Sequence, residues 1–378
     1  MFHLQVKNFG VLKDIDIQLN TTNLFIGDNG SGKSTLAKLI TVLTDFTIDE
    51  DEMKKKFQYF NIDFLKDNSF IQLKKDDEIF LEIKHHELYF FNQRKELVEI
   101  VNKNIAIKKE FENRLQNAFT EDDFSQLVNQ KYRELVTSIK NSIYTLESKY
   151  IPAERNLISL FNQSLSNMIR ADIPLPRPLL EFSAHYNSAR HEIKELDLLN
   201  MKYKNENAQD KIYYKDGFSL PLEHSSSGIQ AALPLYLTLK YFASKHENII
   251  IEEPELNLYP ESQIETVKYM IENRNKSSLY IMTHSPYILS ILNLLIFAYK
   301  AAHTNSILKE KVAAIIPQEQ HINPQHFSAY LIKDGTAINI KGEKTGMIQE
   351  NVIDTIGEEL DETFFELTTL FSEFKDAH

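Results

Sequence analysis

The sequence of 378 residues contains no cysteine. Disulfide bonds, zinc sites built from thiolates and cysteine nucleophiles are therefore excluded, and a reducing compartment is compatible with the chain. The first residues show no signal-peptide pattern and run into an expected strand at 2–7, so we expect a cytoplasmic protein. Long hydrophobic runs are also lacking. The longest, 287–299, is too short to span a bilayer, so we expect no membrane partner.

Positive charge is in deficit, because the formal net charge is −12. Such a chain does not attract nucleic acid over a broad surface. Its lysine clusters, at 54–56, 74–75 and 108–109, are interleaved with acidic residues, which is typical of solvated surface. Nucleic-acid binding would need a local basic groove, which the charge does not indicate.

A phosphate-binding loop follows a short apolar strand at 23–26. The next eight residues match the pattern G-x-x-x-x-G-K-[ST], and a helix with one apolar face is expected at 34–43. Glycines let backbone N–H groups face the phosphates, Lys33 neutralises phosphate charge, and the Ser34 hydroxyl ligates magnesium. The predicted nucleotide-binding residues are Gly27, Asp28, Asn29, Gly30, Ser31, Gly32, Lys33, Ser34 and Thr35, of which Thr35 is foremost a helix residue.

Two carboxylates follow a second apolar strand, at 249–251. A carboxylate at the end of a rigid strand can orient an attacking water, which we predict for Glu253, and Glu252 is predicted to meet the magnesium shell. His284 follows a third strand, at 279–282, and is predicted to contact the terminal phosphate. The alternative, a solvated acidic pair and a structural histidine, is disfavoured by the three isoleucines before Glu252 and by the order of the motifs.

A serine-glycine turn at 225–230 opens an apolar helix and also suits a phosphate. Because the loop at 27–34 already binds the chain's own nucleotide, this turn would bind the nucleotide of a neighbouring chain. The sequence therefore predicts a dimer as well as an activity.

The chain is expected to form an ATPase core interrupted by a helical insertion. We predict the N-terminal part of the core at 1–94, an inserted α-helical arm at 95–205, and the C-terminal part at 206–378. Helices are expected within the arm at 157–170 and 179–200, separated by three prolines. Hairpins are expected at 2–19, 212–221 and 327–340, and a strand-rich stretch at 57–91. A final amphipathic helix at 348–374 either caps the core, which we favour, or holds a partner.

This order of motifs resembles the ABC-type ATPases of the SMC and OLD-like groups. It is especially similar to stand-alone bacterial AAA-family ATPase heads found in anti-phage or abortive-infection systems. The resemblance implies an α/β P-loop NTPase head with a mixed, mostly parallel sheet covered by helices. It also implies ATP and Mg²⁺ as ligands, and a homodimer or higher homo-oligomer with ATP between the heads.

The resemblance also assigns residues. It implies that Ser227, Gly228 and Gln230 contact the γ-phosphate of ATP held by the other subunit, and that 255–258 is a subunit-contact loop. Two positions depart from the transporter-like pattern, Ile229 in place of a glycine and Glu252 in place of an aspartate. The family also has a glutamine that contacts magnesium. We predict Gln72 for this position, and Gln58 and Gln93 are the alternatives.

We therefore expect an ATPase that dimerises around ATP and acts as a sensor or switch for a separate effector protein, in phage defence. One alternative is a scaffold in which ATP is structural and turnover incidental. Another is a DNA-repair head that binds duplex ends.

Overall fold

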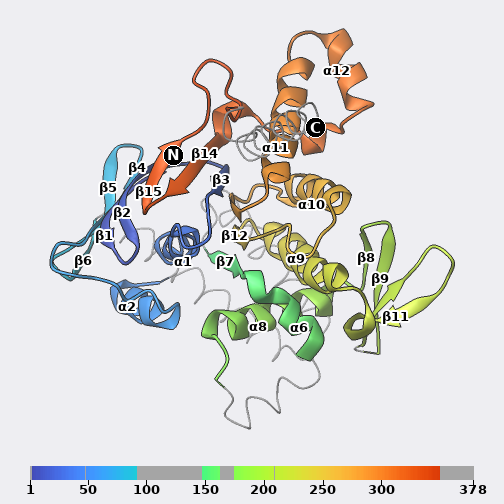
Figure 1. The fold of residues 1–378 in the computed structure, drawn as a ribbon, viewed down its shortest axis with the longest axis horizontal. Helices are drawn as coiled ribbons and strands as arrows, with labels where there is room; N and C mark the ends of the chain where they lie inside the picture. The colour runs from blue at the N-terminus through green and yellow to red at the C-terminus, as the bar shows by residue number, and fades with distance from the viewer. Residues whose placement is uncertain (1, 47, 92–146, 162–173, 208, 350–378) are drawn as a thin grey trace, which may run out of the picture.

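The structure is a computed structural model that describes residues 2–46, 48–91, 147–161, 174–207 and 209–349 (Figure 1). Within these ranges an eleven-stranded mixed sheet has the order β6-β5-β4-β1-β2-β15-β14-β3-β13-β12-β7. Its strands are β1 (Phe2–Phe9), β2 (Leu12–Leu19), β3 (Thr22–Ile26), β4 (Phe70–Lys75), β5 (Glu78–Lys84), β6 (Glu87–Phe90), β7 (Ser148–Ile151), β12 (Asn248–Glu252), β13 (Leu279–Thr283), β14 (Phe327–Lys333) and β15 (Thr336–Asn339). The α/β class with a mixed sheet, predicted from the sequence, is confirmed.

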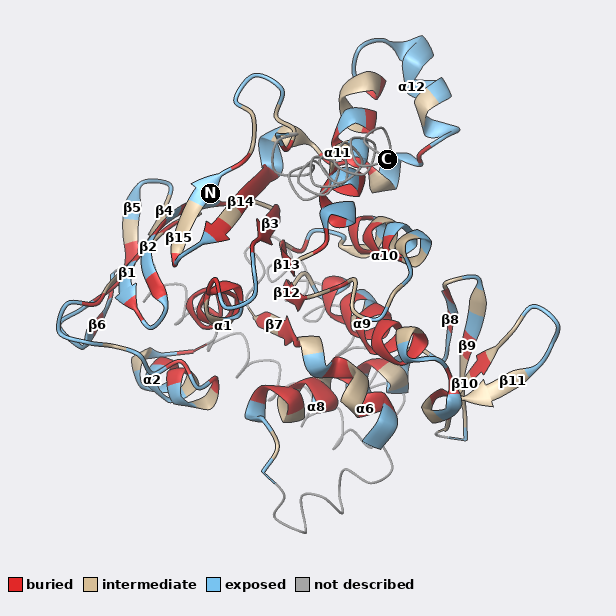
Figure 2. Cartoon of the chain, viewed as in Figure 1, coloured by how far each residue is buried: buried red, intermediate tan, exposed pale blue. Residues whose placement is uncertain are grey.

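One end of the sheet, from β14 to the edge strand β7, is parallel. β3 pairs with β13, β13 with β12 and β12 with β7, all in the same direction. Every residue of β3, β12 and β13 is buried, as expected for strands covered on both faces (Figure 2). The carboxyl ends of these strands consequently meet at one edge, which is where ligands bind in open α/β sheets.

Helices cover both faces of the parallel strands. α1 (Lys33–Leu43) and α2 (Glu50–Tyr59) contribute to the core on one face, where Phe25, Ile250 and Tyr280 point. The opposite face, with Leu24 and Ile251, packs against the other long helices. These are α8 (Arg177–Glu192), α9 (Ser227–Ala243), α10 (Pro260–Asn273) and α11 (Pro286–Ala302), and the shorter α6 (Asn156–Phe161) and α12 (Ser306–Ala313) complete the described helices.

The expected hairpins at 2–19 and 327–340 are confirmed as β1–β2 and β14–β15. The strand-rich stretch is present from β4 to β6, but its beginning was misassigned, because α2 extends to Tyr59. A capping box starts this helix: Asp49 accepts a hydrogen bond from the Glu52 backbone, and Glu52 bonds the Asp49 N–H in return.

A second sheet is entirely antiparallel and lies beside α9 and α10 (Figure 1). Its strands, in the order β11-β10-β9-β8, are β8 (Glu195–Leu198), β9 (Met201–Glu206), β10 (Gln209–Tyr213) and β11 (Ser219–Pro221). The expected hairpin at 212–221 corresponds to β10 and β11. The predicted helix at 179–200 is wrong after Glu192, because the alternating Leu196 and Leu198 bury one face of a strand.

The described part of the predicted arm differs from an all-helical insertion. β7 belongs to the main sheet through its parallel pairing with β12, and α8 packs against the core. Residues 92–146 and 162–173 lie outside the described residues, as does most of the expected final helix. At the start of that helix Ile348 instead forms a bridge with Lys341. None of the described helices is long and apolar enough to cross a membrane.

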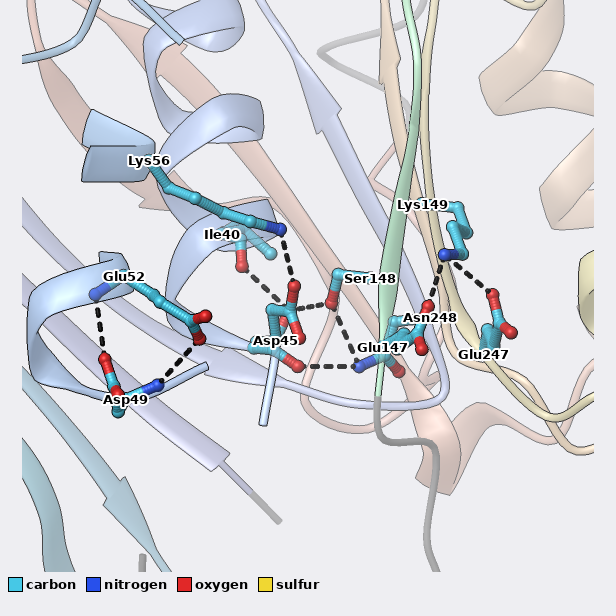
Figure 3. Close-up of polar contacts among 11 residues, drawn as sticks. Ile40, Asp45, Asp49, Glu52, Lys56, Glu147, Ser148, Lys149, Glu247 and Asn248 are labelled. Atoms are coloured by element: carbon cyan, nitrogen blue, oxygen red, sulfur yellow. Dashed lines mark hydrogen bonds and ion pairs between the residues drawn. The ribbon is translucent and has the colours of Figure 1, made fainter. Parts of the chain in front are cut away.

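A partly buried charged cluster lies where β7 and β12 begin, at the edge opposite their carboxyl ends (Figure 3). Lys149 forms ion pairs with Glu147 and with Glu247, the latter at 3.5 Å. Lys56 pairs with Asp45 at 2.7 Å and so ties α2 to the end of α1. These pairs compensate charges that the packing removes from water.

Candidate nucleotide-binding site

The loop between β3 and α1 has the conformation that its glycines allow. Gly30 and Gly32 have φ values of 77° and 109°, which residues with a side chain rarely adopt. A Cβ atom on Gly27 would lie 2.1 Å from the Ile332 carbonyl oxygen, so β14 approaches the loop too closely for any side chain there. Asp28 and Asn29 at the tip of the loop are exposed.

Lys33 is the first residue of α1 and is almost fully buried. Its Nζ donates to the carbonyl oxygens of Gly27 at 2.6 Å and Asp28 at 2.8 Å. Burial lowers the pKa of Lys33, and the nearby carboxylates, Glu253 foremost, oppose that shift. The ammonium group thus lies inside the loop, within the field of the acidic residues from β12.

Glu252 is the last residue of β12 and is 6% exposed. Its Oε1 atom is buried and has no hydrogen-bond partner among the described residues. Burial raises the pKa of Glu252, while the hydroxyls of Tyr150 and Ser34 and the charge of Lys38 act in the opposite direction. An unpartnered buried carboxylate oxygen beside the Ser34 hydroxyl fits a hard cation such as Mg²⁺.

Glu253 follows β12 with a φ of 45°, in the left-handed region. Its N–H donates to the Met282 carbonyl at 2.8 Å, which ties it to the neighbouring strand β13. Its Oε1 lies 3.3 Å from Nε2 of His284, and both side chains are about one-third exposed. The two residues expected to act on the terminal phosphate therefore meet at the edge of the sheet.

His284 is held in place by Glu255. Oε1 of Glu255 accepts hydrogen bonds from the Thr283 hydroxyl at 2.6 Å, the His284 N–H at 2.9 Å and the Ser285 N–H at 3.2 Å. This carboxylate therefore caps the turn after β13 within its own chain. That intrachain function is additional to the subunit contact expected of 255–258.

The serine-glycine turn begins α9, with Ser226 and Ser227 exposed. A Cβ atom on Gly228 would lie 2.8 Å from the Asn257 carbonyl oxygen, so the turn packs directly on the 255–258 loop. Gln230 differs from the expectation. Its buried amide donates to the carbonyls of Ser225 and Glu223, at 2.9 and 3.1 Å, and so stabilises the turn from inside rather than facing a phosphate.

The structure does not bring Gln72 to the other predicted magnesium ligands. Gln72 lies in β4, and its amide donates to Glu82 at 2.7 Å. β1, β2, β15 and β14 separate β4 from β3 in the sheet. Gln58 is exposed on α2, and Gln93 lies outside the described residues. In the described parts of the chain no group of three or more His, Asp or Glu side chains could hold a metal by itself.

Sequence reasoning missed one residue that touches this site. Arg155, which follows β7, is fully buried, and its guanidinium donates to the carbonyls of Glu252 at 2.7 Å and Glu253 at 2.6 Å. The signal in the sequence is faint, an arginine between Pro152 and an apolar helix. Its importance follows from the pairing of β7 with β12, which joins segments about a hundred residues apart.

Comparisons with known proteins agree with this geometry. The family model described as "AAA domain, putative AbiEii toxin, Type IV TA system" matches residues 23–290. That range contains the phosphate loop, the two carboxylates and His284.

Two curated relatives match more distantly. The OLD nuclease of Thermus scotoductus is 22% identical over 342 residues, which covers 75% of this chain and 58% of the nuclease. The phosphate import ATP-binding protein PstB of Saccharolobus solfataricus is 27% identical over 133 residues, 30% of this chain and 52% of PstB. The chain thus spans just over half the length of the curated relatives it matches.

Among solved structures, the Smc head domain from Pyrococcus furiosus, bound to the C-terminal domain of ScpA, is 12% identical. The alignment covers 89% of this chain and 95% of that one, with a TM-score of 0.36. Another, cbiO1 of the cbiONQ ABC transporter complex from Clostridium perfringens, is 14% identical over 98% of each chain, with a TM-score of 0.33. Both TM-scores are low, so these likenesses identify no activity.

Proposed function

The chain belongs to the family of AAA domains described as putative AbiEii toxin, type IV TA system, and from this premise we propose that it binds and hydrolyses ATP between two copies of itself. One observation carries the proposal. The phosphate loop, Glu253 and His284 follow the neighbouring parallel strands β3, β12 and β13, and Glu252 ends β12, so all of them lie at the carboxyl ends of these strands. The field of Glu253 on Lys33 and the contact between Glu253 and His284 support this convergence.

In the proposed reaction, the N–H groups of the loop and the ammonium group of Lys33 hold the phosphates of ATP. Lys33 would exchange its bonds to the Gly27 and Asp28 carbonyls for bonds to phosphate oxygens. Glu253 would accept a hydrogen bond from the attacking water and orient it in line with the terminal phosphate. His284 would donate to a terminal phosphate oxygen, which stabilises the charge that spreads in the transition state.

The Ser34 hydroxyl and the free Oε1 of Glu252 would hold Mg²⁺, directly or through water. Bound there, the ion would neutralise charge on the outer phosphates. Glu252 suits this position because its carboxylate is desolvated and one of its oxygens has no partner among the described residues.

The second half of each site would come from the other copy. Ser226 and Ser227 at the start of α9 are exposed, and the chain's own Lys33 already lies in its own phosphate loop. Two chains related by a two-fold axis would each close the other's site. ATP would then stabilise the dimer by mass action, and hydrolysis would release it.

We further propose that this cycle switches a separate effector protein in defence against phage, in the cytoplasm. The description of the family as a putative toxin of a toxin–antitoxin system supports this step, and no residue of the chain does.

The test is Glu253→Gln, compared with the wild type and with Lys33→Ala. Glu253→Gln should keep ATP binding, reduce phosphate release by about 100-fold or more, and prolong the life of the ATP-bound dimer. Lys33→Ala should bind neither ATP nor, in its presence, a second copy. Wild-type phosphate release that is unchanged by Glu253→Gln contradicts the assignment of Glu253. An ATP-dependent dimer with no phosphate release at all would instead favour a scaffold.

A further inference from the structure

Arg155 bonds to two elements that carry opposite halves of the proposed site. It ends a short 3-10 helix, Ala153–Arg155, directly after β7, and none of its surface is exposed. Its Nη1 donates to the Glu252 carbonyl at 2.7 Å and its Nη2 to the Glu253 carbonyl at 2.6 Å. Its Nε donates to the Ala231 carbonyl at 3.0 Å, in the first turns of α9. One planar guanidinium thus joins the backbone of Glu253 to the helix that begins with Ser227.

The chemistry of these bonds indicates a positioning function. Burying a guanidinium costs free energy, and each of its bonds to these two elements goes to a neutral carbonyl rather than to a carboxylate. The charge is balanced at longer range by Glu255, Glu253 and Glu252, so the arginine also depends on the acidic site that it supports. The rigid fork of donors can fix the relative position of several carbonyls, which a lysine ammonium cannot.

The Glu253 backbone needs such support. Its φ of 45° is unfavourable for a residue with a side chain, and such conformations persist only where surrounding bonds hold them. β7 ends at Ile151, opposite Ile251, so it does not extend to the carbonyls of Glu252 and Glu253. The guanidinium of Arg155 instead supplies hydrogen-bond donors to these two carbonyls.

A proline in α9 leaves a backbone carbonyl near the start of that helix available to the segment that contains Arg155. Pro234 lies inside α9 and has no N–H, so the carbonyl of Gln230 loses its donor within the helix. The hydroxyl of Ser159, in α6, donates to that carbonyl at 2.7 Å. The segment 153–159 therefore contacts two successive carbonyls near the start of α9, Gln230 through Ser159 and Ala231 through Arg155.

We infer that Arg155 is a positioning residue that couples the serine-glycine turn of a chain to the Glu253 of the same chain. ATP held by the partner copy would contact the turn that begins α9, and the guanidinium would transmit the resulting shift to the carboxylate that orients water at the chain's own ATP. The inference rests on the proposed function. It predicts that hydrolysis at one ATP site depends on whether ATP occupies the other site, and that Arg155 is the residue responsible for this dependence.

The first test compares Arg155→Lys with the wild type, using ATP binding and phosphate release. The lysine keeps the positive charge but lacks the planar set of donors of the guanidinium. The ATP affinity of the variant should therefore stay within about two-fold of the wild type, while its turnover should fall by about 100-fold with KM nearly unchanged. A melting temperature near that of the wild type confirms folding. Wild-type turnover in Arg155→Lys overturns the inference and leaves the proposed function standing. A wild type that does not hydrolyse ATP overturns the proposed function instead.

Mixed dimers separate coupling from simple support of Glu253. A chain carrying Lys33→Ala has no ATP of its own but can complete the site of a wild-type partner, whose own serine-glycine turn then faces an empty site. With an excess of the Lys33→Ala chain, we expect turnover per ATP-bound chain to fall at least several-fold below that of the wild-type dimer. When the ATP-bound chain carries Arg155→Lys, its turnover should be the same in the mixed dimer as in the Arg155→Lys dimer, because the coupling is already lost. No fall for the wild-type chain, or a fall of equal size with and without Arg155→Lys, would overturn the coupling.

Discussion

Nε2 of His284 lies 3.3 Å from Oε1 of Glu253, across the ends of the adjacent strands β13 and β12. Both side chains are about one-third exposed, so either can reach a ligand at the edge of the sheet. Two polar groups from different strands can therefore act on the same phosphate and water.

Substitution of His284 should affect turnover more than binding. His284→Ala removes the proposed donor to the terminal phosphate, and we expect phosphate release to fall by about 100-fold with ATP affinity nearly unchanged. His284→Gln keeps a donor and should retain more activity than alanine. The side chain is partly exposed, so the melting temperature should change little. Full turnover in His284→Ala would contradict its assigned contact.

Glu255 offers a matched pair of variants. Glu255→Ala leaves the Thr283 hydroxyl and the His284 N–H without their acceptor, while the Ser285 N–H keeps only its bond to the Thr283 hydroxyl. The variant should therefore reduce the free energy of unfolding by about 2 kcal/mol. Glu255→Gln keeps an acceptor oxygen in the same place and should cost about half as much. Chemical denaturation measures both. Equal stability of the alanine and glutamine variants would show that these hydrogen bonds contribute little.

Glu247 predicts a pH dependence of stability. Burial raises its pKa to about 7, although Lys149 opposes the shift. The native chain therefore binds more protons than the unfolded chain between the ordinary carboxyl pKa and about 7, and the stability from this group is lost as pH rises through that window.

The variant Glu247→Gln should remove this loss. Between about pH 5 and pH 8, the free energy of unfolding of the wild type should fall relative to the variant by about 1 kcal/mol or more. Lys149 keeps Glu147 as a partner in the variant, so its charge stays compensated. Denaturation curves at several pH values measure the difference, and two parallel pH profiles would exclude Glu247 as its source.

The sequence predicts those parts of the fold whose signals are local. The phosphate loop lies between an apolar strand and a helix with an apolar face, and the structure contains both. β12 and β13 are short runs of large apolar residues, a sequence pattern that is typical of fully buried parallel strands. The residues that follow them are positioned by the chain direction alone, so Glu253 and His284 could be predicted to lie at one edge.

What could not be predicted depends on contacts distant in sequence. β7 has four residues and no distinct pattern, and only its pairing with β12 makes it a strand. The environment of Arg155 follows from that pairing. Gln72 was chosen by its place in the chain, but the antiparallel strand β4 directs its amide to Glu82. The capping box before α2 and the alternating leucines of β8 were readable signals that were overlooked.

The left-handed backbone of Glu253 has a consequence for how the chain tolerates change. At a φ of 45°, glycine or asparagine has a lower conformational energy than glutamate. Selection for stability alone would therefore remove the carboxylate from this position, and on the proposed function its presence reflects a compromise between stability and activity. Searches for stabilised variants of this protein should yield substitutions at residue 253, and each of them should be inactive.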